Sequence, residues 1–176
     1  MEEIRLLNPT MEYEEDILQF REELINANDD DAFAGCGSLR RCQTVKEWLA
    51  DLAIHENPET CPKGGVTSNT YIAVRSSDNR IVGIIDLRHH INHPVLGLWG
   101  GHIGYSVRPS ERGKGYAKEM LRLDLENCKK KNINKVMITC SNKNQASEKV
   151  ILANGGVFEK EVNVEGEIIK RFWITL

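Results

Sequence analysis

The segment from residue 102 to residue 117 constrains the fold of this chain more than any other part of the sequence. Residues 102–107 indicate a strand, Pro109 ends it, and glycines at positions 113 and 115 open a helical pattern. The first amides of a helix have no intrahelical acceptor, and the helix dipole places about half a positive charge beside them. A strand, a glycine-rich turn and a helix in this order favour a site for an anion such as phosphate.

Residue types at this turn narrow the choice of anion site. Gly113 and Gly115 let the backbone approach a phosphate without a Cβ atom in the way, and Arg112, Lys114 and Lys118 add cations. The Walker pattern needs a hydroxyl residue after Gly-Lys, and the dinucleotide pattern needs a glycine where Lys118 stands, so both are excluded. A plain strand-to-helix turn with solvated basic residues remains the alternative.

Length and composition indicate a single domain whose net charge would not attract nucleic acid. The 176 residues suffice for one packed domain and are short for two. The formal net charge is −3, and no apolar run approaches the roughly 20 residues that span a membrane. The N-terminus has no features of a secretion signal. We therefore expect a cytoplasmic protein with neither nucleic acid nor membrane as a partner.

Five scattered cysteines form no C-x-x-C pair, so we expect neither a disulfide framework nor a metal site. A zinc site from Cys36, Cys42, Cys61 and His55 is the weaker alternative, because these spacings fit no common ligand pattern.

Apolar spacing predicts one mixed α/β domain without repeats or linkers. We expect helices at residues 12–27 and 44–55, after Gly115 and after Asn144, with Thr44 and Asn144 as N-caps. The first helix should bury Ile17, Phe20, Leu24 and Ile25. Strands are expected at residues 4–7, 70–75, 81–88, 102–107, 135–140, 156–164 and 167–176, with the last two joined by a turn at Glu165-Gly166.

Two motifs at a suitable separation resemble one protein family. The run Arg112-Gly113-Lys114-Gly115-Tyr116-Ala117 matches the Gln/Arg-x-x-Gly-x-Gly/Ala signature of the GNAT acetyltransferase superfamily. Asn144 and Ser147, followed by residues 154–158, are similar to the family's second motif. The order of elements is similar over roughly the whole chain, most strongly from residue 70. The wording around residues 100–112 resembles a little-characterised bacterial subgroup of predicted acetyltransferases.

This resemblance implies an α/β (α+β) fold in which about four helices flank a twisted, mostly antiparallel sheet of about seven strands. It implies an enzyme that moves an acetyl group from acetyl-CoA directly to an amine, and a homodimer. Residues 1–69 would be mainly the acceptor side, and residues 70–176 the CoA-binding core. An inactive CoA-binding regulatory domain and a nucleotide- or phosphate-binding module are the alternatives.

The resemblance also implies roles for individual residues. The amides of residues 113–117 would hold the CoA diphosphate, and the backbone of residues 105–107, splayed by a bulge, would pair with the pantetheine arm. The implied CoA-binding residues are Tyr105, Ser106, Val107, Arg112, Gly113, Lys114, Gly115, Tyr116, Ala117, Asn144 and Ser147. Many relatives carry a tyrosine seven residues after the asparagine as the acid for the thiolate, whereas this chain has Ile151.

Acetyl transfer to an amine calls for a base, because forming the neutral amine at pH 7 costs about 4–5 kcal/mol for a lysine-like group. His102, at the start of the expected CoA-contacting strand, is the first candidate. Asp86 is the second, and it shares a strand face with Arg88, so an internal ion pair is the alternative. The weaker candidates are His89, His90, His93 and Glu111, the last expected to be solvated. The acidic run 29–31 would attract a cationic acceptor or simply be solvated.

Overall fold

The strands of the chain form two antiparallel sheets. In the computed structural model, which describes residues 1–29 and 32–176, the first sheet has the order β1-β2-β3-β4 and the second has the order β5-β7-β6. Their bounds are β1 (Ile4–Leu7), β2 (Ser68–Arg75), β3 (Ile81–Arg88), β4 (Ile103–Val107), β5 (Lys135–Ser141), β6 (Val157–Val164) and β7 (Glu167–Thr175). This arrangement confirms the expected α/β fold class with about seven strands.

Within residues 1–29 and 32–176, four α-helices connect and cover the strands. They are α1 (Glu14–Ala27), α2 (Val45–Glu56), α3 (Tyr116–Lys130) and α4 (Gln145–Ala153), with short 3-10 helices at Met11–Tyr13 and Pro109–Glu111 and a π-helix, η2, at Leu96–Gly100. Both expected N-caps are confirmed: Thr44 accepts a hydrogen bond from the Glu47 amide, and Asn144 accepts one from the Ser147 amide. In the described part of the chain, no helix is long and apolar enough to cross a membrane.

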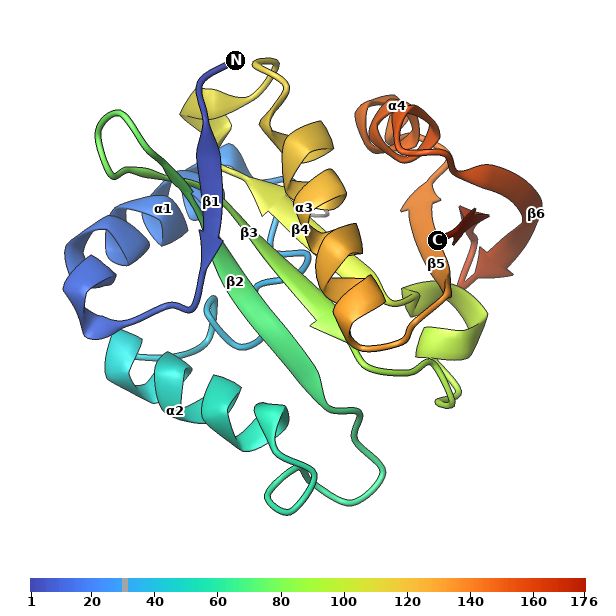
Figure 1. The fold of residues 1–176 in the computed structure, drawn as a ribbon, viewed down its shortest axis with the longest axis horizontal. Helices are drawn as coiled ribbons and strands as arrows, with labels where there is room; N and C mark the ends of the chain where they lie inside the picture. The colour runs from blue at the N-terminus through green and yellow to red at the C-terminus, as the bar shows by residue number, and fades with distance from the viewer. Residues whose placement is uncertain (30–31) are drawn as a thin grey trace.

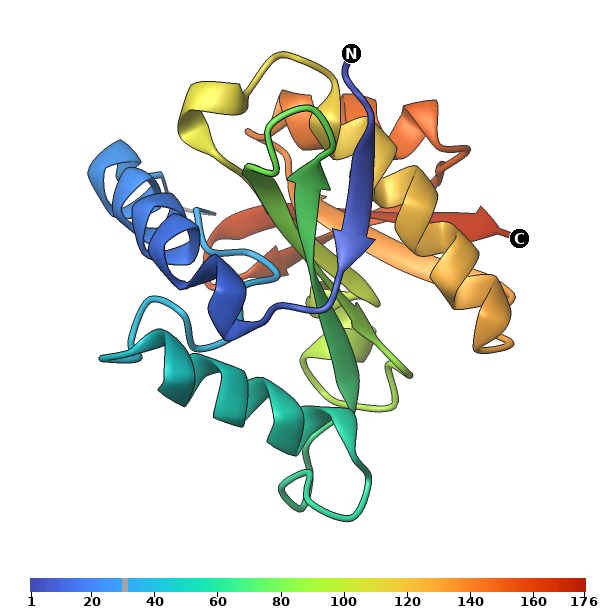
Figure 2. The same cartoon turned by 60° about the vertical axis from the view of Figure 1, so that its left-hand side comes forward.

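Helices lie on both faces of the first sheet. Figures 1 and 2 show α1 and α2 against one face and α3 against the other. Successive side chains of a strand point to opposite faces, so Ile72 and Ile84 pack toward α1 and α2, while Ala73 and Ile85 pack toward α3. Because both faces are covered, β3 is buried over almost its whole length, which explains its continuous apolar sequence.

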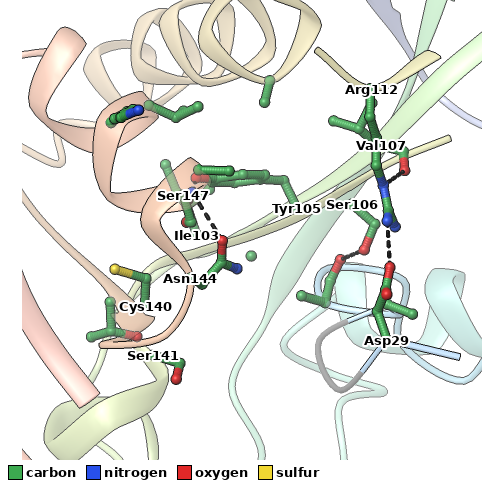
Figure 3. A pocket seen from close by; sticks show the side chains of 18 of the residues that line it. Asp29, Ile103, Tyr105, Ser106, Val107, Arg112, Cys140, Ser141, Asn144 and Ser147 are labelled. Atoms are coloured by element: carbon green, nitrogen blue, oxygen red, sulfur yellow. Dashed lines mark hydrogen bonds and ion pairs between the residues drawn. The ribbon is translucent and has the colours of Figure 1, made fainter. Parts of the chain in front are cut away.

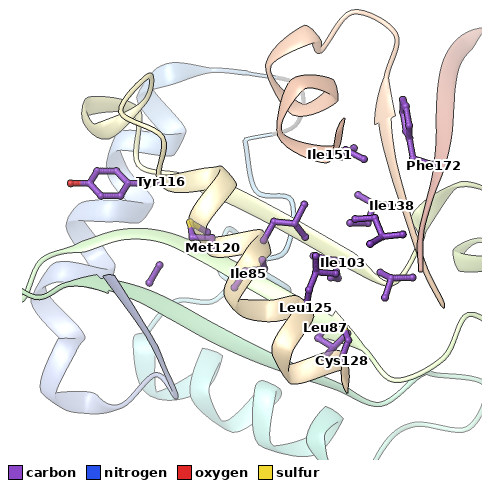
Figure 4. Close-up of a cluster of buried hydrophobic side chains, with 14 of the residues drawn as sticks. Ile85, Leu87, Ile103, Tyr116, Met120, Leu125, Cys128, Ile138, Ile151 and Phe172 are labelled. Atoms are coloured by element: carbon purple, nitrogen blue, oxygen red, sulfur yellow. The ribbon is translucent and has the colours of Figure 1, made fainter. Parts of the chain in front are cut away.

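The helix that follows the glycine turn joins the two sheets into one core. Met120, Leu121, Leu125 and Cys128 recur at helical spacing along α3 and are all buried. Figure 4 shows this face of α3 beside side chains of both sheets and of α4. One prediction about the helices is wrong: Ile25 in α1 is 45% exposed, because it lies off the stripe that faces β3.

The two sheets are linked at the beginnings of β4 and β5. The His102 amide donates to the Met137 carbonyl at 2.8 Å, and the Met137 amide donates to Nδ1 of His102 at 2.9 Å. Beyond this link the two strands belong to separate sheets, and Figure 1 shows them diverging. The predicted bulge is absent, because the register between β3 and β4 is continuous from Ile103 to Val107.

Candidate active site

The glycine-rich turn has the geometry of an open helix N-terminus. Gly113 and Gly115 have φ angles of 74° and 89°, in the left-handed region that favours glycine. Gly115 is the N-cap of α3, and no side chain caps this end. A Cβ atom at Gly113 would meet nothing within 4 Å, so the turn faces open space. Its amides are therefore available to an anion.

A cavity of about 990 Å³ begins at this turn and follows the gap between β4 and β5. This volume is at the upper end of the range for small-molecule sites. Its wall also includes Asp29, Ala34, Arg88 and Trp99, which come from the α1–α2 loop, β3 and η2. The predicted CoA-binding residues in its wall are Tyr105, Ser106, Val107, Arg112, Gly113, Gly115, Tyr116, Ala117, Asn144 and Ser147.

One edge of β4 has backbone groups for a ligand that lies in the cavity. The Arg108 amide donates to the Val82 carbonyl, and the register with β3 is continuous. Because hydrogen-bonding groups alternate between the two edges of a strand, the even-numbered residues of β4 bond to β3. The odd-numbered residues direct their N–H and C=O groups to the opposite edge: Ile103, Tyr105 and Val107. An extended polar arm can pair with this edge as a further strand would.

Lys114, predicted to meet a CoA phosphate, lies outside the cavity wall. Its Nζ atom is 2.8 Å from Oε2 of Glu111, and Arg75 reaches the same oxygen at 2.9 Å. Glu111 is 6% exposed, so the expectation that it is solvated is wrong. Burial would raise the pKa of Glu111, but the hydrogen bonds from Lys114 and Arg75 lower it below its ordinary value. These ion pairs with Arg75 and Lys114 attach Glu111 to the glycine-rich turn. Because they favour the ionised carboxylate, Glu111 is not suited to take up a proton.

Arg112 crosses the mouth of the cavity. Its guanidinium forms an ion pair with Asp29, the member of the acidic run 29–31 that the structure describes, and its Nε atom donates to the Val107 carbonyl at 3.4 Å (Figure 3). The pair connects the glycine-rich turn to the α1–α2 loop. The other members of the acidic run, Asp30 and Asp31, lie outside the described residues.

Tyr105 and Ser147 approach each other across the gap. The phenol oxygen of Tyr105, on β4, lies 2.7 Å from Oγ of Ser147, on α4. Figure 3 shows the ring extending from the strand toward the first turn of α4, beside Asn144. Burial raises the pKa of Tyr105 to about 12, partly opposed by the hydrogen bond with Ser147. The phenol is therefore neutral at physiological pH.

Both leading candidates for the base have their acceptor atoms engaged. Nδ1 of His102 accepts the Met137 amide, so the imidazole would have to lose this bond before taking a proton there. Burial, together with the charge of Arg88, lowers the pKa of His102 to about 4. Asp86 accepts from Thr70 at 2.8 Å and pairs with Arg88 at 3.2 Å, which is the internal ion pair that its strand position suggested. Neither His102 nor Asp86 lines the cavity. The geometry argues against both as the base.

The three loop histidines are also engaged locally. His89 contacts Thr67 at 2.8 Å and Asn69 at 2.7 Å through its two ring nitrogens, and burial lowers its pKa. His90 and His93 each accept a backbone amide two residues further along the chain. Within the ranges that the structure describes, no three His, Cys, Asp or Glu side chains gather as a metal site would require.

Several residues that line the cavity were not predicted from the sequence. Glu167 lines the cavity near the start of β7, and it forms no ion pair with any described residue. Trp99 lines the cavity from the π-helix η2, and its backbone carbonyl accepts a hydrogen bond from the Thr139 hydroxyl at 2.6 Å. A charged residue after a hairpin turn carries no local signal of this role, whereas an extra-wide helical turn often marks a functional site.

Solved acetyltransferase structures share this fold over nearly the whole chain. The microcin C7 self-immunity acetyltransferase MccE, solved with acetyl-CoA and AMP, has a TM-score of 0.69 at 16% identity, covering 99% of this chain and 93% of that one. RimL, the ribosomal L7/L12 alpha-N-protein acetyltransferase, solved with coenzyme A, gives 0.67 at 13%, covering 98% and 94%. The ribosomal-protein-S5-alanine acetyltransferase from Vibrio fischeri gives 0.67 at 18%, covering 98% and 91%.

Structures at 13–18% identity show the fold alone, whereas a family model that matches the sequence also shows the family. No curated protein sequence matches the chain significantly. The family model described as "Acetyltransferase (GNAT) domain" matches residues 14–157, which include the glycine-rich turn, β4 and the first turn of α4. The chain therefore belongs to the GNAT acetyltransferase family.

Proposed function

We propose that this protein transfers an acetyl group from acetyl-CoA directly to an amine. The observation that carries the proposal is the continuous cavity from the open N-terminus of α3, past the free edge of β4, to the loop that follows α1. A diphosphate, an extended amide arm and a reacting thioester would occupy these three parts in order. The relatives solved with acetyl-CoA or coenzyme A support acetyl-CoA as the donor.

The donor would be held mainly by backbone groups. The amides of Gly113 to Ala117 would bind the diphosphate, and Arg112 would add charge at the same place. Tyr105 and Val107 would pair through their backbones with the pantetheine amides. Asn144 and Ser147 line the wall where α4 begins and would contact the arm from the opposite side. An amide on this β4 edge would also stabilise the oxyanion of the tetrahedral intermediate.

We propose Glu167 as the base, directly or through a water molecule. It is a carboxylate in the cavity wall that is not committed to an ion pair with a described residue. Asp29, by contrast, is paired with Arg112, and Glu111 is buried between Arg75 and Lys114. A base of this kind would take one proton from the ammonium group of the acceptor, which is needed before attack on the thioester.

The acceptor is an amine of undefined identity. The structures with this fold include a ribosomal L7/L12 alpha-N-protein acetyltransferase and a spermidine N-acetyltransferase, whose acceptors are different kinds of amine. The decisive experiment measures release of the CoA thiol from acetyl-CoA with small amines, amino acids, aminoglycosides, polyamines and N-terminal peptides. Turnover with one class supports the proposal. Tight CoA binding without turnover across all classes would favour the inactive regulatory domain, and preference for ATP over CoA would favour the nucleotide-binding alternative.

We also propose a cytoplasmic homodimer. The five cysteines are all thiols, as a reducing compartment requires. Exposed apolar side chains on neighbouring elements, Val157 and Phe158 on β6 and Leu98 on η2, provide a surface for a second copy. Light scattering during gel filtration tests this assembly: a mass near 40 kDa, twice the 20.0 kDa of one chain, supports it, whereas a mass near 20 kDa refutes it.

A further inference from the structure

Arg88 is a cation in the cavity wall that stands apart from the glycine-rich turn. It is the last residue of β3, whereas Gly83, five residues earlier on the same strand, lies opposite Val107 at the end of β4 that leads into the turn. Five residues of strand span about 17 Å. A charge at this distance from the turn is not placed to neutralise a diphosphate, so it serves a different group.

The side chain of Arg88 extends over β4 on the face of the first sheet that carries α1 and α2. It shares this strand face with Ile84, which packs toward those helices. Its Nη2 atom lies 3.2 Å from the position that a Cβ atom of Gly104 would occupy. Gly104 also lines the cavity and directly precedes Tyr105, whose backbone would pair with the pantetheine arm. The guanidinium therefore lies where the arm would end and the thioester would begin.

The guanidinium of Arg88 is held on two sides and open on the third. Its Nε atom lies 3.2 Å from Oδ2 of Asp86, and its Nη1 atom donates to the carbonyls of Gly100 and Gly101 at 3.2 and 3.4 Å. Nη2 has no hydrogen-bond partner among the described residues and is not enclosed by them. Because Nη2 carries two hydrogens, a fixed cation presents two N–H donors to a ligand.

A structural role accounts for only part of this arginine. The carbonyls at the end of η2 are bound by two arginines: Arg88 binds those of Gly100 and Gly101, and Arg171 donates to those of Gly97 and Leu98 at 3.4 and 3.2 Å. Arg171 does not line the cavity. Support of η2 by Arg88 uses Nη1 alone, so the two N–H groups of Nη2 remain for another purpose.

We propose that Nη2 of Arg88 binds a carboxylate of the acceptor, so that the acceptor is a small amine that carries a carboxylate, such as an amino acid. The inference rests on the proposed acetyl transfer and narrows its acceptor. A guanidinium binds a carboxylate about twice as strongly as it binds a neutral oxygen, and its planar fork fixes the direction of the bond. The carboxylates of Asp29 and Glu167 in the same wall suit the ammonium group of such a molecule.

Matched pairs of acceptors test this inference. Release of the CoA thiol is measured with α-amino acids and their carboxamides, and with aspartyl and glutamyl dipeptides and their asparaginyl and glutaminyl counterparts. For each pair, the ratio of kcat/KM for the acid to kcat/KM for the amide is compared between the natural protein and its variants, so differences in amine basicity cancel. We expect Arg88→Gln to lower this ratio about ten- to hundredfold, mainly by raising the KM for the acid.

Three further variants separate contact with the acceptor from changes in charge or in η2. Asp86→Asn/Arg88→Gln removes both members of the ion pair, so no unpaired carboxylate is left, and it should lower the ratio as Arg88→Gln does. Arg171→Gln removes the other arginine that binds η2 and should leave the ratio unchanged. Arg88→Lys keeps the charge without the fork and should lower the ratio by a smaller factor.

The outcomes distinguish this inference from the proposed function. Turnover of amines with an unchanged ratio in Arg88→Gln and in the double variant would overturn the role of Arg88 and leave acetyl transfer intact. An equal fall in Arg171→Gln would also overturn it, because the position of η2 would then explain the effect. If Arg88→Gln does not fold, an unchanged ratio in Arg88→Lys is decisive instead. Failure of every carboxylate-bearing amine overturns the inference, whereas the proposed function is refuted only if calorimetry detects no CoA binding.

Discussion

The guanidinium of Arg112 is paired with the carboxylate of Asp29 across the mouth of the cavity. One partner belongs to the glycine-rich turn and the other to the α1–α2 loop. If a diphosphate binds at this turn, as we propose, it would compete with Asp29 for Arg112 and leave the carboxylate without this partner. The pair would thus link donor binding to the charge of the α1–α2 loop.

Asp29→Ala should strengthen acetyl-CoA binding modestly. Both side chains are partly exposed, at 42% and 44%, so the pair contributes at most about 1 kcal/mol, or about fivefold in affinity. Calorimetry at low and high salt measures the effect, which should shrink as salt screens the pair. Glu126→Ala, which breaks an exposed pair with Lys129 near the end of α3, is the control and should not change the affinity. Weaker acetyl-CoA binding in Asp29→Ala would contradict the competition.

Gly115→Glu should abolish CoA binding. The side chain would occupy the N-terminus of α3 with a negative charge where the diphosphate belongs, and a Cβ atom there would already lie 3.3 Å from Sδ of Met1. Strain must be separated from this effect, because the φ angle of 89° disfavours any side chain. Gly64→Glu is the control, because Gly64 has a similar φ angle of 83° and open space around it but does not line the cavity. Both variants should lose similar stability, and only Gly115→Glu should lose CoA in calorimetry.

Asn144→Ala should weaken both the fold and CoA binding. Its side chain accepts the Ser147 amide at 3.0 Å, and loss of such a cap costs about 1 kcal/mol in free energy of unfolding. Thr44→Ala is the matched control, because Thr44 caps α2 in the same way at 3.1 Å but does not line the cavity. Denaturation should show similar losses, whereas calorimetry should show weaker CoA binding only for Asn144→Ala. Equal CoA affinity in both would leave Asn144 with a structural role alone.

The sequence predicts the fold well because the relevant signals are local. The spacing of Met120, Leu121 and Leu125 within α3, and the two cap residues, each depend on neighbours along the chain. The conformation of the glycine-rich turn is predicted for the same reason, since it depends on the nearby residues Gly113 and Gly115. The predicted burial of Ile25 is wrong because a helix buries only the stripe that its neighbours cover. The width of that stripe depends on how the sheet packs against the helix.

Side-chain roles that depend on distant residues are not predictable in this way. His102 meets the amide of Met137, 35 residues away, and Tyr105 meets Ser147, 42 residues away. Glu111 looks like a surface residue in the sequence, yet Arg75 from another strand covers it. Only the folded chain shows which polar atoms are already engaged and which face the cavity, so the base cannot be assigned from residue type and strand position.

Asp124→Asn should stabilise the protein at neutral and higher pH. Asp124 is fully buried on α3, its Oδ2 atom has no partner among the described residues, and burial raises its pKa to about 7. An unfolded aspartate has a pKa near 3.9, so the unfolded chain releases this proton first and stability falls as pH rises from about 4 to 7. The substitution should add about 2–4 kcal/mol to the free energy of unfolding at pH 8 and little at pH 4. An equal gain at both pH values in urea denaturation would contradict this account.

His102→Asn separates a structural role of His102 from a catalytic one. The side-chain oxygen of asparagine can occupy the place of Nδ1 and accept the Met137 amide, but it cannot act as a base near neutral pH. We expect this variant to keep wild-type activity and most of its stability. His102→Ala should instead lose about 1–3 kcal/mol, because a buried amide is left without an acceptor.

The pH dependence provides a second measurement on the same residue. With a folded pKa of about 4 and an unfolded pKa near 6.5, His102 is neutral in both states above pH 6.5, and only the unfolded chain gains its proton below that. Its contribution therefore lowers stability as pH falls from about 6.5 to 4, and His102→Asn should flatten this part of the stability curve. The acidic limb of the rate profile, in contrast, should be the same in the variant and the natural protein. A well-folded His102→Asn whose kcat falls 10²–10⁴-fold at neutral pH would instead establish His102 as the base, since that is the usual contribution of general base catalysis.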